Sequence, residues 1–116
     1  MTPKETAEFA CKVLYDKKGS DIITLEIADM TIITDYFVIA SAHSTTQVKA
    51  LANYVDEKFS EIGIEPLRRE GMSEGRWAVL DYGSIIVHIF HDETRMFYCL
   101  ERLWNNGTNI EKYQGE

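Results

Sequence analysis

The stretch that decides the fold is residues 76–104, which read RWAVLDYGSIIVHIFHDETRMFYCLERLW. Residues 77–82 and 85–91 are rich in aromatic and β-branched side chains, and the short break Gly83-Ser84 separates them. Two such runs around a polar break predict a β-hairpin. Apolar residues then fall at positions 96, 97, 100, 103 and 104, which is the spacing of one face of a helix. The stretch therefore predicts strand, turn, strand and helix, in that order.

Two earlier helices are predicted from capping boxes at their starts. The sequence Thr2-Pro3-Lys4-Glu5 combines a capping box with a proline at the first helical position, and it predicts a helix over residues 3–17. A second box, Ser44-Thr45-Thr46-Gln47, begins an amphipathic helix that ends at Gly63. A helix of about 18 residues spans roughly 27 Å, which is long enough to cross a whole sheet.

Three further strands are predicted in the rest of the chain. Residues 22–28 alternate between apolar and polar side chains, as in a strand with one wet face. Residues 36–40 are continuously apolar, which is typical of a central strand covered on both faces. Residues 67–69 follow Pro66 and suit an edge strand. The fold class is therefore α/β (α+β), with a mixed five-stranded sheet flanked by helices.

The chain of 116 residues is predicted to form a single domain over residues 1–104. Residues 105–116 are polar and lack periodicity, so we expect a flexible tail there. No apolar run approaches the ~20 residues that cross a bilayer, and the N-terminus lacks the apolar region of a secretory signal. Cys11 and Cys99 have neither a close pair nor a metal-ligand spacing, which is typical of reduced thiols. We therefore expect a cytoplasmic protein with no membrane contact.

The net charge of −7 limits the partners that the chain can bind. Nucleic-acid affinity comes mostly from lysine and arginine, so a chain this acidic is repelled by phosphate backbones and has no direct nucleic-acid specificity. Its electrostatic complement is a basic surface, such as that of a basic protein. The alternative interpretation is that the charge serves only solubility.

Motifs for catalysis or metal binding are incomplete in this sequence. His88 and His91 lie three apart in a predicted strand, so they point to opposite faces, and no third ligand follows. Asp81 lacks the alternating second acid with which nucleotidyl transfer holds Mg²⁺. Residues 41–44 form no nucleophile elbow, and residues 71–75 lack the Lys-Ser/Thr of a phosphate loop. We therefore expect a protein that is not an enzyme and that needs no metal or cofactor.

A candidate binding surface lies on the first strand of the hairpin. Alternation places Trp77, Val79 and Asp81 on one face, and Ala78, Leu80 and Tyr82 on the other. Trp77 beside Asp81, with Glu70 nearby, would form an aromatic anchor ringed by acids, which suits a basic protein. Tyr98 and Glu101 on the last helix would extend this surface. The alternative interpretation places Trp77 in the core and leaves the acids in solvent.

A series of motifs in this order and spacing resembles the ribosomal silencing factor family, whose members are also called Iojap-like proteins. The resemblance covers residues 5–104. The matching motifs are Asp35–Ser41, Ser44, Gln47-Val48, Glu70-Gly71, Trp77, Leu80–Gly83, Val87–Phe90, Arg95, Phe97-Tyr98 and Leu100–Trp104.

The resemblance implies a fold related to nucleotidyltransferases but without their catalysis. It also implies binding to the large ribosomal subunit through its fourteenth protein, which hinders joining of the small subunit and represses translation. On this basis we expect Trp77 to anchor the partner and three acids to pair with it, namely Glu70, Asp81 and Glu101. Three further residues would support or shape the site, namely His88, Arg95 and Tyr98.

Two other functions stay open at this point. The first is a nucleotidyltransferase-like enzyme or nucleotide-binding protein, and the second is an interaction module with a non-ribosomal partner. An open sheet face would also leave room for a homodimer.

Overall fold

Capping residues set the start of both long helices. In the computed structural model, which describes residues 1–115, α1 spans Pro3–Asp16 and α2 spans Thr45–Glu61. The Thr2 hydroxyl accepts a hydrogen bond from the Glu5 N–H at 3.1 Å, and the Glu5 carboxylate accepts one from the Thr2 N–H at 2.9 Å. The Ser44 hydroxyl accepts one from the Gln47 N–H at 3.0 Å. Side-chain acceptors thus satisfy helical N–H groups that have no partner within the helix, and both predicted helices are confirmed.

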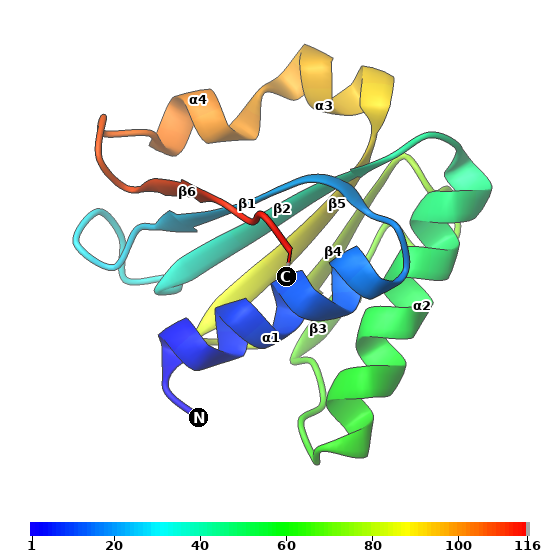
Figure 1. The fold of residues 1–116 in the computed structure, drawn as a ribbon, viewed down its shortest axis with the longest axis horizontal. Helices are drawn as coiled ribbons and strands as arrows, with labels where there is room; N and C mark the ends of the chain where they lie inside the picture. Colours follow the sequence, from blue (N-terminus) through cyan, green and yellow to red (C-terminus); the bar gives the residue numbers. More distant parts are fainter. Residues whose placement is uncertain (116) are drawn as a thin grey trace.

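The sheet is built from β1 (Ser20–Glu26), β2 (Tyr36–Ala42), β3 (Arg68–Glu70), β4 (Trp77–Asp81), β5 (Ile85–His91) and β6 (Ile110–Lys112). It is mixed, as predicted, with the strand order β3-β4-β5-β2-β1-β6. The central pair β2 and β5 is parallel, and all other neighbours are antiparallel. The flanking helices lie in two layers, with α1 and α2 on one face of the sheet and two shorter helices on the other (Figure 1).

The sheet has six strands within residues 1–115, so the prediction of five was wrong. The sixth, β6, lies within the segment expected to be a flexible tail, and it pairs antiparallel with β1 so that Ile110 stands opposite Leu25. The Asn109 side-chain amide donates to the carbonyl oxygens of Glu26 and Trp104, each at 2.9 Å. Backbone pairing and one amide side chain hold this strand, and three residues are too few for alternation to reveal it in the sequence.

The final helix is also different from the prediction, because it is two short helices. These are α3 (Asp92–Tyr98) and α4 (Leu100–Trp104), and Cys99 between them has a left-handed backbone with φ 47° and ψ 53°. The break turns Leu100 and Trp104 onto the sheet, where both pack against its apolar cluster. The other three residues of the predicted apolar face stay exposed: Met96 at 79%, Phe97 at 81% and Leu103 at 75%.

The two faces of the sheet carry two separate apolar clusters. The cluster under α1 and α2 contains fully buried residues such as Leu14, Leu51 and Phe59, and it receives Ala78 and Leu80 from β4. The opposite cluster, under α3 and α4, is built on β1, β2 and β5, and half-buried Trp77 and Val79 pack against it. The predicted alternation along β4 is thereby confirmed. Within residues 1–115, no helix is long and apolar enough to cross a membrane.

Candidate functional site

Trp77 lies at the margin of the second cluster and is half-buried. Its register opposite Phe90 in the β4–β5 pair brings the two rings to a centroid distance of 4.8 Å, nearly parallel. The ring of Tyr98, from α3, lies 5.0 Å away on a different element. The indole of Trp77 therefore packs against the apolar cluster and also lines a pocket on the surface, and its role as a binding anchor stays a prediction.

His88 holds the indole of Trp77 in place. The Trp77 Nε1–H donates to His88 Nδ1 at 3.0 Å, and the imidazole is only 7% exposed. Burial disfavours the charged form and lowers the pKa of His88 from 6.5 to about 4, so the imidazole is neutral near pH 7. Because Nδ1 accepts, the proton of the neutral ring is on Nε2, which has no hydrogen-bond partner among the described residues.

A surface pocket of about 750 Å³ opens in front of Trp77, and we call it the Trp77 pocket. It lies where α3 passes the start of β4 and the loop that follows β3. Gly71 lets that loop lie against β4, because its φ is +73° and a Cβ there would collide with the Trp77 carbonyl oxygen. The lining residues are Glu70, Gly71, Glu74, Arg76, Trp77, Val79, Glu93, Thr94, Phe97 and Tyr98.

The Trp77 pocket combines exposed aromatic rings with an excess of carboxylates. Three glutamates and one arginine line it, which leaves a formal charge of −2. Glu74 and Glu93 form no ion pair with any described residue, and Glu70 has only a loose one, 3.7 Å from Arg68. Carboxylates accept hydrogen bonds and attract cations, whereas the aromatic rings offer apolar surface. The pocket therefore suits a long side chain that ends in a cation.

Four of the seven predicted site residues are brought together by the fold. Glu70, Trp77 and Tyr98 line the Trp77 pocket, and His88 lies behind it in contact with the indole. Asp81 shares their face of the sheet but is engaged elsewhere. Its carboxylate accepts from the Gly83 N–H at 2.9 Å and lies 3.7 Å from Arg68.

Arg95 and Glu101 are not in the Trp77 pocket. The Arg95 guanidinium pairs with the Glu101 carboxylate at 3.2 Å, and it donates to the Asp21 carbonyl at 2.7 Å and to the Ser41 hydroxyl at 2.8 Å. These bonds tie α3 to α4, β1 and β2. The Arg95 side chain is only 11% exposed, which makes its role here structural.

Sequence reasoning missed Glu74, Arg76, Glu93 and Phe97, which all line the pocket. In the sequence, the loop that carries Glu74 is considered only as a phosphate loop. The apolar spacing of the last helix predicts that Phe97 lies on its buried face. One signal for the site was present, since Glu93 and Phe97 are four apart and therefore share one face of a helix.

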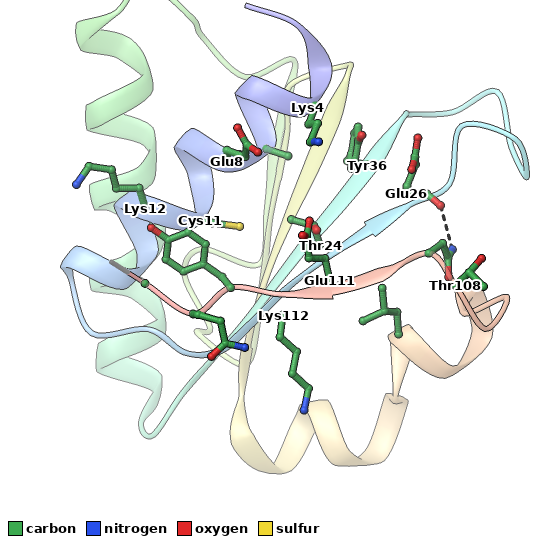
Figure 2. Close-up of a pocket in the computed structure, with 16 residues that line it drawn as sticks. Lys4, Glu8, Cys11, Lys12, Thr24, Glu26, Tyr36, Thr108, Glu111 and Lys112 are labelled. Atoms are coloured by element: carbon green, nitrogen blue, oxygen red, sulfur yellow. Dashed lines mark hydrogen bonds between the residues drawn. The ribbon is translucent and has the colours of Figure 1, made fainter.

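Two other cavities differ from the Trp77 pocket in their charge. One, of about 660 Å³, lies between α1 and β6 (Figure 2), and its three lysines match its three glutamates in number. Burial raises the pKa of Cys11 at its floor to about 12, so this thiol stays protonated near pH 7. The other, of about 950 Å³, contains the Arg95–Glu101 pair, whose charges are already matched. This last cavity also has an exposed tyrosine, Tyr15, and an acid without an ion pair among the described residues, Asp21. Its three acids and two cations give a formal charge of −1, against −2 in the Trp77 pocket.

Within residues 1–115, no group of three or more His, Cys, Asp or Glu side chains is placed so that it could hold a metal ion. The side chain of His88 instead accepts a hydrogen bond from Trp77. The carboxylate of Asp81 accepts one from the Gly83 N–H and pairs with Arg68.

Comparison with known proteins identifies the family. The whole chain, residues 1–116, matches the family described as ribosomal silencing factor during starvation. A ribosomal silencing factor of Halalkalibacterium halodurans is 34% identical over 111 residues, which are 96% of this chain and 95% of that protein. A Mus musculus protein named mitochondrial assembly of ribosomal large subunit protein 1 is 30% identical over 95 residues, which are 79% of this chain and 42% of that protein.

The fold agrees with this relationship. A crystal structure of a Chromobacterium violaceum protein superposes with a TM-score of 0.87 at 36% identity, and the match covers 90% of this chain and 87% of that one. This chain and these relatives thus share sequence and fold over most of the molecule. The chain belongs to the ribosomal silencing factor (RsfS) family.

Proposed function

We propose that this protein binds the large ribosomal subunit through its fourteenth protein, sterically blocks joining of the small subunit and thereby represses translation. The observation that carries the proposal is the Trp77 pocket, in an acidic member of the ribosomal silencing factor family. Relatives named for ribosome silencing and for assembly of the ribosomal large subunit support the same process.

The chemistry of the pocket supports a basic protein as the direct partner. Ribosomal proteins meet phosphate backbones with lysine and arginine, and such a surface is complementary to a pocket with a formal charge of −2. A half-buried tryptophan with further aromatic rings beside it has the composition of a binding hot spot. Translation takes place in the cytoplasm, where we expect the protein to act.

Steric blocking requires a footprint and no reaction. A domain with principal extents of 34 × 34 × 29 Å would occupy a substantial area at the face where the two subunits meet. Neither a nucleotide nor a metal is needed for this mechanism. Asp81, the acid considered for nucleotidyl transfer, instead accepts from the Gly83 N–H within the hairpin turn.

Co-sedimentation of the purified protein with isolated subunits tests the proposal. We expect the wild-type protein to sediment with the large subunit alone at physiological salt and to reduce its joining to the small subunit. Trp77→Ala should weaken binding about thirtyfold or more, because a central aromatic anchor contributes ~2–4 kcal/mol.

Tyr54→Ala is the matched control, since it removes a half-buried aromatic ring from the α1–α2 side of the molecule. It should bind the subunit like the wild type. Far-UV circular dichroism of both variants establishes that they are folded. Binding by folded Trp77→Ala with wild-type affinity would contradict the proposed site, and no binding by the wild-type protein would contradict the proposed function.

A further inference from the structure

We propose that the Trp77 pocket binds a single arginine side chain of the protein partner, with the guanidinium among the three glutamates and its stem against the aromatic rings. The assignment rests on the proposed function, since it names the chemical group that the same pocket recognises. The proposal excludes a neutral or acidic side chain as the group that enters the pocket.

The pocket has more free acceptors than donors. Glu74 and Glu93 are exposed and form no ion pair with a described residue, whereas Glu70 is shared loosely with Arg68. The one strong donor of the tryptophan is not available, because the indole N–H is bonded inward to His88 at 3.0 Å. A guanidinium supplies five N–H donors and no acceptor, which is the complement of this arrangement.

Arg76 is the one cation that lines the pocket, and it leaves the carboxylates free. It is exposed and forms no ion pair with a carboxylate in residues 1–115, and its backbone carbonyl is bonded to the His91 N–H at 2.9 Å. Three carboxylates against one guanidinium leave room for a further positive charge from outside. The cavity between α1 and β6 has no such excess, because its three lysines balance its three glutamates.

The aromatic rings favour arginine over lysine. Phe97 is 81% and Tyr98 50% exposed, and their rings meet edge to face at 5.1 Å, which forms a corner of apolar surface beside the acids. A guanidinium is planar, stacks on aromatic faces and binds carboxylates with two parallel hydrogen bonds. An ammonium is more strongly hydrated and has no flat face, so it gains less from the same corner.

His88 is a positioning residue in this site. It touches the indole and does not line the pocket, and its neutral Nδ1 removes the indole N–H from the surface that faces the partner. A variant that cannot accept this hydrogen bond would free the N–H and allow the indole to turn. The preference of the pocket for a donor-rich group would then fall, even in a protein that remains folded.

Titration of the full-length protein with blocked amino acids tests the proposal. The probes are N-acetyl-arginine amide, N-acetyl-lysine amide and the neutral isostere N-acetyl-citrulline amide, and the readout is the NMR signal of the Trp77 indole N–H. We expect a saturable shift with arginine amide and a several-fold weaker response to lysine amide. Citrulline amide should give no saturable shift, because it keeps the shape of arginine and lacks its charge.

A paired variant locates the binding. Glu74→Gln/Glu93→Gln should weaken arginine amide binding about fivefold to tenfold, the loss expected for two exposed charge contacts. The control Glu8→Gln/Glu57→Gln makes the same change in net charge, with its substitutions on α1 and α2. It should leave the affinity for arginine amide unaltered. Equal binding of citrulline and arginine amides, no saturable shift, or equal losses in the two double variants would overturn the assignment.

Co-sedimentation separates this inference from the proposed function. Wild-type binding of Glu74→Gln/Glu93→Gln to the large subunit, together with loss of binding in Trp77→Ala, would refute the arginine assignment and leave the proposed function intact. Saturable binding of arginine amide by a protein that never sediments with the large subunit would refute the proposed function and keep the arginine pocket.

Discussion

The two faces of the sheet are covered in different ways. On one face, α1 and α2 contribute ten buried apolar residues between them to a continuous cluster. On the other face, α3 and α4 contain no buried residue, and the rings of Phe97 and Tyr98 remain exposed beside Trp77. Burial of apolar area is the main source of stability, whereas exposed aromatic rings are typical of binding surfaces. We therefore expect a division between the two pairs of covering helices, in which α1 and α2 contribute more to stability and α3 helps to form the proposed binding site.

The largest expected effect is the difference in stability between two phenylalanine-to-alanine substitutions, one on each face. Phe59 is fully buried, stacks on Tyr82 at 4.2 Å and meets Phe9 edge to face at 5.0 Å. Phe59→Ala should lower the free energy of unfolding by about 3–5 kcal/mol. Phe97→Ala should change it by less than about 0.5 kcal/mol, because that ring is already in solvent. Urea unfolding of both variants measures the contrast, and equal losses would show that the division is wrong.

The buried histidine of the second face should make stability depend on pH. The pKa of His88 falls from 6.5 to about 4 in the folded protein. As the pH falls, the unfolded chain therefore binds the proton before the folded protein does. The contribution of neutral His88 to the free energy of unfolding is complete above pH 6.5 and declines between pH 6.5 and 4. The full loss is about 3 kcal/mol.

Urea unfolding at a series of pH values from 7.5 to 4 measures this decline. The reference is His88→Asn, which keeps an acceptor for the Trp77 indole and does not titrate in this range. The wild-type protein should lose more stability than His88→Asn over the window. Parallel curves for the two proteins would contradict a buried neutral imidazole.

A smaller loss of stability is expected when the Arg95–Glu101 ion pair, which ties α3 to α4, is removed. Arg95→Met removes bonds to the Asp21 carbonyl, the buried Ser41 hydroxyl and the Glu101 carboxylate. The loss should be about 1–3 kcal/mol, since polar groups are left without partners. Amide exchange should accelerate over residues 92–104, because α3 loses its tie to β1 and β2.

Arg102→Met is the control for this prediction, since Arg102 is exposed and forms no ion pair within the described part of the chain. It should leave both stability and exchange near wild-type values. A loss of similar size in the two variants would mean that the Arg95 contacts do not hold α3 and α4 on the sheet.

Local sequence by itself determined the two long helices, the hairpin and the mixed sheet. Capping boxes at Thr2 and Ser44 mark helix starts through hydrogen bonds within four residues, and alternation along residues 77–82 follows from the pleat of a strand. The motif series also indicated the family, which the comparisons confirm. Trp77, Glu70 and Tyr98 were correctly brought together as neighbours, although their role in binding stays a prediction.

Only the tertiary structure decided the sixth strand, the break at Cys99 and the composition of the pocket. β6 depends on pairing with β1, some 85 residues earlier in the chain, and on the bonds of Asn109 to Glu26 and Trp104. The break turns the predicted apolar face in two directions, so Phe97 faces solvent while Leu100 packs on the sheet. Contacts between residues distant in sequence produce these features, and no local pattern of side chains encodes them.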